Sequence, residues 1–500
     1  MSESMRIARL LGLAGVEVDT VEQEADGSWT AHVTTAAGQA VRCPDCGRHA
    51  GRVKEPSVHT FAHLAVVPLR VTWHKRRLWC GNNDCQTGAF AESGPVARAG
   101  AGVSESGRAT MGHLVGDWMV AVCRVAAGAG VSWHTAHAGF IGVADQAGIS
   151  VEAASTSAQP ETQPQPEPQP EGQAQPGWDA KDEHGQQPSG AACGVSPLVQ
   201  VLGIDEHRRG KPRFHRDPAS GAWVADADRW QTVFVDSTGG HGLLGQVQGR
   251  TKTDVTGWLA AQDPAWRAAV RFVTIDMSSV FKSAATAGLL PNARVVVDPF
   301  HVTQLANKMV DDVRRRLTYA RYGRRGRTGD PEYDLKNLLR RGKEHLSHKN
   351  RHKLLCALAD LGGTAGRQLG AAWRAKELVR DLLKLSPNRT GNATTRDKAC
   401  TALVAFFEFA ATIGATVPEI QTLAETISTW RNEIARAVLT GHSNAAAEGV
   451  NRLIKLVYRT AFGLTNVTNQ QRRARYTASR STRPNWLHPV TATTPQPVAA

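Results

Sequence analysis

The sequence predicts a multidomain chain in which a small cysteine-containing β module and a pair of helices precede an α/β domain with acidic strand ends. Three observations predict this organisation: two cysteine pairs near the amino terminus, a segment rich in Pro, Gln and Glu, and a strand–helix–strand pattern beyond it. In that pattern the apolar runs 270–275 and 295–297 end at Asp276 and Asp298. Parallel strands place such carboxylates at one edge of a sheet, where open α/β sheets bind their ligands. The length of 500 residues allows about three domains.

The charge of the chain favours a polyanionic partner. The formal net charge is +14, and between His301 and Asp360 there are fifteen Lys or Arg residues against seven Asp or Glu. This region contains the predicted DNA contacts Arg314, Arg315 and Arg316, and the interleaved Tyr319 and Tyr322 are candidates for stacking on bases. A basic protein without a polyanionic partner is the alternative. The chain has no run of about 20 apolar residues and no signal-peptide pattern, so no membrane partner and a cytoplasmic location are expected.

Residues 1–98 are predicted to form a zinc ribbon. Zn²⁺ takes four soft ligands in tetrahedral geometry, and the two pairs can supply four thiolates: Cys43, Cys46, Cys80 and Cys85. The segment between the pairs alternates apolar and polar residues, as a β-hairpin does, and so small a module needs one structural Zn²⁺ to fold. Two unconnected cysteine pairs, or a redox role for the first pair, are the alternatives. In a reducing compartment, cysteines at this spacing favour a metal site over disulfides.

Residues 99–150 are predicted to form a helix-turn-helix domain. Gly130 supplies the turn, and Ser132 caps a second helix that starts at Trp133. That helix would present its first residues to the major groove of DNA, so the predicted contacts are Ser132, His134, Thr135 and His137. A helical hairpin with no DNA-binding role has the same pattern. Residues 151–196 are rich in Pro, Gln and Glu and are predicted to be a disordered linker, because this composition buries little apolar surface.

Residues 197–302 are predicted to form the sheet of the catalytic domain. Three strands with hairpin-like connections are expected first, and their apolar runs are 198–204, 230–235 and 243–247. A helix capped by Thr251 follows, and then strand, helix and strand. This is the strand order of the ribonuclease H-like fold. The first run ends at Asp205, which gives a third acidic strand end.

Residues 303–439 are predicted to form a helical, basic insertion, and residues 440–480 return to the catalytic domain. The returning segment contains a helix capped by Ser443 or Asn444. One face of this helix is apolar, and the opposite face carries a carboxylate followed by amide and basic groups: Glu448, Asn451, Arg452, Lys455 and Arg459. The basic and amide groups are predicted phosphate contacts. An ordinary solvated helix face is the alternative.

Three carboxylates from separate segments repel one another when all are ionised, which predicts a cation between them. Two Mg²⁺ ions (or Mn²⁺) would resolve the conflict, because these ions take oxygen ligands and bridge to substrate phosphates.

Five motifs taken together resemble those of DDE transposases, and most closely those of the ISL3 family of bacterial insertion sequences. They are the segments 201–211, 274–278, 297–302, 372–377 and 443–455. That family also has an amino-terminal zinc finger, so the resemblance covers most of the chain outside the linker. It implies that Asp205 and Glu448 are catalytic. The ribonuclease H-like strand order indicates Asp276 as the second catalytic Asp, and Asp298 as a possible additional catalytic or metal-binding residue.

The resemblance also implies a function. The chain is expected to bind the terminal inverted repeats of its insertion sequence and to catalyse Mg²⁺-dependent DNA strand cleavage and strand transfer. Its expected location is the bacterial cytoplasm, in association with the nucleoid. Two DNA ends must be paired, so a homodimer or higher oligomer on double-stranded DNA is expected. Two alternatives remain open at this point. One is a metal-dependent, structure-specific DNA nuclease, and the other is a non-catalytic, zinc-dependent DNA-binding regulator.

Overall fold

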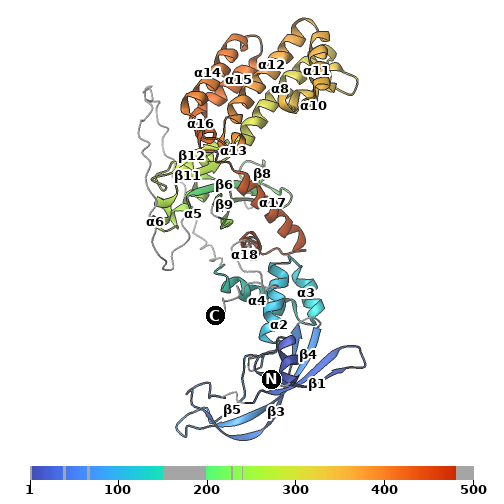
Figure 1. Cartoon of the computed structure of the whole chain (residues 1–500), viewed down its shortest axis with the longest axis vertical. Coiled ribbons are helices and arrows are strands. Elements are labelled where there is room, and N and C mark those ends of the chain that lie inside the picture. Colours follow the sequence, from blue (N-terminus) through green and yellow to red (C-terminus); the bar gives the residue numbers. More distant parts are fainter. Residues whose placement is uncertain are drawn as a thin grey trace, which may run out of the picture.

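The computed structural model describes residues 3–37, 41–64, 68–98, 100–149, 199–226, 229–238 and 240–479. These residues form an elongated molecule (Figure 1). The amino-terminal β module lies at one end, followed by three helices, the central sheet and, at the far end, a helical insertion. The predicted linker at 151–196 lies outside the described residues. No helix in the described part of the chain is long and apolar enough to cross a membrane.

The amino-terminal module is a five-stranded sheet with one helix. Its strand order is β1-β2-β4-β3, and β5 pairs with β4. The alternation seen in the sequence is real, because Val71 and Trp73 of β4 are buried beside Phe61 of β3, while their neighbours along the strand are more exposed. The elements are α1 (Glu3–Leu10), β1 (Val16–Gln23), β2 (Trp29–Thr35), β3 (Ala50–Leu64), β4 (Pro68–Cys80) and β5 (Ala89–Ala91).

Three helices follow, namely α2 (Glu105–Gly116), α3 (Val122–Ala129) and α4 (Trp133–Gln146). Gly130 ends α3 with a positive φ of 65°, and Ser132 accepts a hydrogen bond from the Thr135 backbone N–H, so the predicted turn and cap are both present. Helices α2 and α4 cross at Gly112 and Gly139. A Cβ atom on Gly112 would overlap the Gly139 carbonyl oxygen, so this crossing requires glycine.

The Gly112→Ala variant is therefore expected to be less stable by about 1–3 kcal/mol, since overpacking forces the two helices apart. Gly142→Ala, in the same helix pair, is the matched control because nothing lies within 4 Å of its added Cβ. That substitution should be neutral or stabilising by about 0.5–1 kcal/mol, because alanine loses less backbone entropy than glycine in a helix. Chemical denaturation of the two variants measures the difference, and equal stabilities would contradict the close crossing.

The central sheet has the strand order β10-β9-β6-β11-β12. Strands β6, β9 and β10 are antiparallel to their neighbours in this group, and β11 and β12 run parallel to β6. The strands are β6 (Val201–Arg208), β9 (Trp230–Asp236), β10 (Leu243–Gln248), β11 (Phe272–Ile275) and β12 (Arg294–Val297). The connections contain a small hairpin that the sequence did not predict, β7 (Phe214–Arg216) with β8 (Trp223–Ala225), and the helices α5 (Lys252–Ala260), α6 (Pro264–Ala269) and α7 (Ser279–Ala285).

The prediction that the first strand ends at Asp205 is wrong. Strand β6 continues to Arg208, because its antiparallel partner β9 pairs with it as far as Trp230. Its parallel pairing with β11 does stop earlier, at Gly203 opposite Thr274. Asp205 and Asp276 each lie two residues beyond that pair, so both are at the same level of the sheet.

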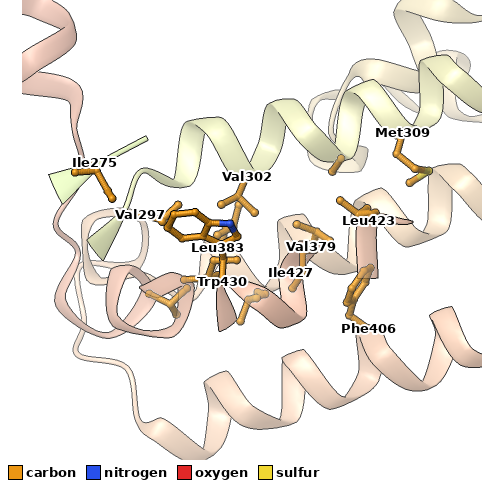
Figure 2. Packing of buried hydrophobic residues seen from close by; sticks show 14 of the residues in the cluster. Ile275, Val297, Val302, Met309, Val379, Leu383, Phe406, Leu423, Ile427 and Trp430 are labelled. Atoms are coloured by element: carbon orange, nitrogen blue, oxygen red, sulfur yellow. The ribbon is translucent and has the colours of Figure 1, made fainter. Parts of the chain in front are cut away.

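The helical insertion shares one hydrophobic core with the sheet. Val297, at the end of β12, lies beside the ring of Trp430 and near Val302 of α8 (Figure 2). Ile275, at the end of β11, belongs to the same core, which extends to Phe406. The insertion is therefore fixed to the acidic edge of the sheet. Its helices are α8 (Pro299–Tyr322), α9 (Pro331–Asp334), α10 (Lys336–Arg340), α11 (His348–Asp360), α12 (Gly363–Lys384), α13 (Pro387–Thr390), α14 (Arg396–Ile413), α15 (Pro418–Thr429) and α16 (Arg431–Thr440).

The last two helices connect the sheet to the amino-terminal half. Helix α17 (Ala445–Thr460) packs on β6 and β9, and α18 (Val467–Ala478) reaches the helices α2–α4. Tyr476 of α18 is 1% exposed within the core of those helices, and its ring lies against Gly116 and Phe140. Helices α2–α4 therefore pack directly against α18, the helix that follows the one carrying Glu448.

Candidate active site

Three carboxylates from separate elements meet at the edge of the sheet. Asp205 comes from β6, Asp276 directly follows β11, and Glu448 lies in the first turn of α17. The imidazole of His301, in the first turn of α8, lies between two of them. Its Nε2 is 3.0 Å from Asp276 Oδ1 and 3.7 Å from Glu448 Oε1. Both carboxylates remain about one quarter exposed, so solvent and substrate can reach them.

Asp205 is the most buried member of this group, at 8% exposure. Burial, and next the nearby charge of Asp276, raise the pKa of Asp205 to about 6. Two hydrogen bonds oppose this shift, since Asp205 accepts from Asn451 Nδ2 at 2.7 Å and from the Glu206 backbone N–H at 2.7 Å. A bound cation would offset both the burial of the Asp205 carboxylate and the charge of Asp276 next to it.

Asp298 lies beside these three carboxylates and also caps a helix. Its side chain is 3% exposed and accepts a hydrogen bond from the Phe300 backbone N–H at 3.1 Å, so it caps α8. Burial raises the pKa of Asp298 above its usual range. Ligand atoms of Asp276, Asp298 and His301 all lie within 4.8 Å of one another. Asp298 therefore remains near enough to join the site or to support it.

The donor set fits hard divalent cations. Carboxylate oxygens are the ligands that Mg²⁺ and Mn²⁺ prefer, and an imidazole nitrogen is also acceptable to Mn²⁺. The pKa of His301 is raised, first by its hydrogen bond to Asp276, so these carboxylates favour the protonated ring; as a metal ligand the ring would be neutral. His301 is not among the site residues predicted from the sequence. The available signal was Asp298-Pro299, because a capping Asp followed by Pro starts a helix and places His301 within its first turn, beside the strand end.

Two asparagines hold the acidic groups in place. Asn444 is fully buried, donates to the Ile204 carbonyl at 3.2 Å and accepts from Thr274 Oγ1 at 3.2 Å, and its Nδ2 lies 3.4 Å from Asp276 Oδ1. It occupies the predicted N-cap position of α17, but its side chain makes no capping hydrogen bond. The start of α17 is instead tied to β6 and β11.

Asn451 was predicted to contact phosphate, and the structure contradicts that placement. Its side chain is 4% exposed and points to Asp205, because the apolar side of α17 that rests on the sheet includes this position. The other predicted contacts on this helix differ. Arg452 is 81% exposed and lies 3.5 Å from Glu448, and Lys455 and Arg459 are also exposed.

Removing the Asn451 amide is expected to lower the rate of DNA strand cleavage about 10–100-fold, the usual effect of losing a residue that orients a metal-binding carboxylate. The Asn451→Ala variant should bind DNA ends as wild type does, because the residue is buried. Leu456→Ala, on the exposed side of the same helix, is the control. Equal cleavage rates for Asn451→Ala and wild type would show that Asn451 does not position Asp205.

The predicted helix-turn-helix contacts are only partly accessible. Ser132 and His134 are exposed and Thr135 is half-buried. His137 is 7% exposed and stacks on Trp133 with ring centroids 4.7 Å apart, and burial lowers its pKa. The prediction that His137 faces the major groove is therefore wrong, since its ring is buried against Trp133 and Phe140.

The three consecutive arginines of α8 have different surroundings. Arg315 is exposed and lies 3.4 Å from Asp312. Arg316 makes an ion pair with Glu419 at 2.7 Å. Arg314 is 6% exposed and pairs with the buried Asp311, so the prediction of a DNA contact fails for Arg314. Helical periodicity explains the difference, because three successive residues of a helix point in three directions.

The four predicted zinc ligands form one cluster. Their sulfur atoms all lie within 4.8 Å of one another, with Cys43 Sγ 3.8 Å from Cys85 Sγ and Cys46 Sγ 3.4 Å from Cys80 Sγ. Zn–S bonds of about 2.3 Å in a tetrahedron place sulfur atoms about 3.8 Å apart, so the cluster could hold a structural Zn²⁺. The Cys46 backbone N–H is the main cause that lowers the pKa of the Cys43 thiol to about 7. The hydrogen bond from the Asn82 backbone N–H lowers the pKa of the Cys80 thiol, but burial and the neighbouring thiols together outweigh it and raise that pKa to about 12, so the zinc assignment rests on the sulfur positions. This arrangement excludes two unconnected pairs.

Comparison with known families places the chain among the transposases. A family model described as Transposase, that of the ISL3 DDE transposases, matches residues 202–474. This range is more than half of the chain, and the chain therefore belongs to the ISL3 family of DDE transposases, as its sequence motifs indicated. The match begins in β6 and ends in α18, so it includes the sheet, the helical insertion and the helix with Glu448. No curated protein and no solved structure matches the chain.

Proposed function

We propose that this transposase binds the terminal inverted repeats of its insertion sequence and catalyses DNA strand cleavage and strand transfer with Mg²⁺ or Mn²⁺. The observation that carries the proposal is the meeting of Asp205, Asp276 and Glu448 around His301, on three elements distant in sequence. Structural roles alone do not require three carboxylates from distant segments to lie together at one edge of a sheet. The strand order, with three antiparallel strands and two parallel ones, supports a ribonuclease H-like catalytic domain.

In this proposal Asp205, Asp276 and Glu448 hold the metal ions, with His301 or Asp298 as further ligand or support. When bound, two divalent ions lower the pKa of the attacking water or 3′-hydroxyl and stabilise the leaving oxygen. Asn451 and Asn444 hold the carboxylates of Asp205 and Asp276 in position. The exposed Arg452 and Lys455 attract phosphates next to Glu448. The solvent-facing side of α17 thus contacts DNA, while its buried side holds the site together.

End recognition is assigned to the amino-terminal half. The zinc cluster and the first turn of α4, with Ser132, His134 and Thr135, are the proposed contacts for the repeats. The packing of Tyr476 against α2–α4 supports a fixed placement of these helices relative to the acidic site. We further propose that two copies pair the two ends, since strand transfer joins both ends of an element.

The proposal is tested with labelled duplexes that carry the element's ends, a supercoiled plasmid target and Mg²⁺. The expected result is end cleavage followed by joining of the 3′-hydroxyl ends to the plasmid. Cleavage without joining would instead support the structure-specific nuclease, and specific binding without either reaction would support the regulator.

A further inference from the structure

A second, cationic cavity lies within the helical insertion. Its volume is about 550 Å³, and it lies between α8 and the segment 324–340. Seven Lys or Arg side chains and a single carboxylate, that of Asp311, line it, together with two tyrosines. This cavity is separate from the carboxylate cluster, and it has the opposite charge.

Most of the lining arginines are fixed by internal ion pairs. Asp311 is 3% exposed and pairs with both Arg314 and Arg340. Arg324 pairs with Asp330 at 2.7 Å. Arg325 and Lys336 differ: within the part of the chain that the structure describes, no acidic side chain forms an ion pair with either. The cavity therefore keeps positive charge that is not neutralised by the protein, and an anion is the ligand that fits it.

The aromatic groups make a nucleotide a better fit than a simple anion. The ring of Tyr333 is already in contact with cations, with Lys336 Nζ 4.7 Å from its centroid and the Arg314 guanidinium 5.8 Å away. Tyr319 is 64% exposed and offers a free ring at the cavity. Cations that follow a phosphate backbone, combined with aromatic rings on which bases stack, are typical of sites for single-stranded nucleic acid. A duplex does not fit into 550 Å³, whereas one unpaired nucleotide does.

A buried ion pair fixes the backbone at the end of α10, where Arg340 lies. Lys376 is fully buried, pairs with Glu377 at 2.7 Å and donates to the carbonyls of Leu339 and Arg341 at 2.6 and 2.7 Å. This buried pair belongs to the motif 372–377, which contributes nothing to the carboxylate cluster. Its contacts instead fix the end of α10, and with it the position of Arg340 between two cavities.

The position of Arg340 connects this cavity to the acidic site. The same side chain also lines a larger cavity of about 1080 Å³ that contains Asp298 and Glu448. Along α8, the distance from His301 to Tyr319 is about 27 Å at 1.5 Å per residue. At 3.4 Å per nucleotide this corresponds to about eight nucleotides of a stacked strand.

We propose that the cavity of the helical insertion binds an unpaired nucleotide of the DNA strand that leaves the acidic site. Arg325 and Lys336 bind its phosphate, and the base stacks on Tyr319. This inference rests on the proposed function, because it takes the DNA strand from the transposition substrate, and it adds a second contact up to about eight nucleotides from the reacting phosphate.

The test measures binding of a labelled oligothymidylate of about twelve nucleotides, and of the duplex it forms with oligodeoxyadenylate, to the full chain without divalent metal. Lys336→Glu is expected to weaken single-strand binding about tenfold or more, and Tyr319→Ala several-fold, with Tyr319→Phe close to wild type. Lys353→Glu and Leu355→Ala, both on the exposed side of α11, are matched controls and should change binding less than twofold. Photocrosslinking of the same oligonucleotide carrying 5-iododeoxyuridine should label the peptide with Tyr319.

The inference would be overturned if Lys336→Glu and Tyr319→Ala bound the single strand as the controls do. It would also be overturned if the crosslinks were confined to the amino-terminal half. If the variants lost affinity for the single strand and for the duplex equally, the site would be an ordinary contact to duplex DNA and would not bind an unpaired nucleotide. No divalent metal is present in this measurement, so its outcome does not depend on catalysis at the acidic site. A wild-type chain that fails to cleave but shows these binding effects would therefore contradict the proposed function and leave this site standing.

Discussion

Asp205→Asn and Glu448→Gln are each expected to lower the rates of DNA strand cleavage and strand transfer by about 10³-fold or more. Both substitutions keep side-chain size and remove one negative charge from the group that would hold the metal ions. Stabilisation of charge in the transition state is lost with the ions, and this is the largest contribution that such a site makes to the rate. Binding of DNA ends, measured by fluorescence anisotropy, should stay within about twofold of wild type, because neither carboxylate is a proposed DNA contact.

Glu206→Gln provides the control for this prediction. Glu206 follows Asp205 directly, but it turns away and pairs with Arg250 at 3.0 Å. Loss of its charge should leave cleavage nearly unchanged. Equal losses of cleavage and end binding in Asp205→Asn and Glu448→Gln would indicate a folding defect and would contradict the catalytic assignment.

Loss of the zinc ligands is expected to have the second large effect, on the stability of the amino-terminal module. The four cysteines lie at the open end of the β3–β4 hairpin, where β3 begins and β4 ends, and only a few apolar side chains, such as Leu78 and Phe90, pack beside Cys43 there. Structural Zn²⁺ contributes about 10–16 kcal/mol of apparent binding free energy in small zinc modules. In Cys43→Ser this part of the sheet should therefore unfold, and specific binding of DNA ends should fall by about tenfold or more.

Zinc content by atomic absorption, thermal unfolding and end binding measure this prediction together. Cys356→Ser is the control, because Cys356 is exposed and lies outside the cluster. Chelation should weaken specific end binding more than it slows cleavage of short, pre-cut substrates. Wild-type protein that contains no zinc and still binds ends tightly would contradict the zinc assignment.

Much of the sheet could be predicted because its signals are local. Each strand of the central sheet contains a short apolar run, and Asp276 and Asp298, which directly follow two of these runs, mark the acidic edge. The extent of β6 could not be predicted in the same way. Its length beyond Asp205 depends on the antiparallel partner β9, about 30 residues away in the sequence, and no local signal reports how long such a pairing lasts.

The residues that were predicted to be exposed but are buried have a different explanation. Asn451, His137 and Arg314 are polar and were expected on exposed helix faces, yet each is buried with a specific partner: Asp205, Trp133 and Asp311. Helical periodicity gives the relative phase of side chains but not which polar group finds a buried partner. His301 was missed for a related reason, since its role depends on Asp276 and Glu448, which reach it from other elements.

The central claim is that Asp276 completes the catalytic group with Asp205 and Glu448, while Asp298 supports it. Strand transfer of labelled element ends to a plasmid by Asp276→Asn and Asp298→Asn, in Mg²⁺, tests this most directly. Asparagine can replace the capping oxygen of Asp298, so Asp298→Asn should still join ends, whereas Asp276→Asn should give no joined product. Joined product from Asp276→Asn together with an inactive Asp298→Asn would contradict the account and move the second catalytic aspartate to the end of β12.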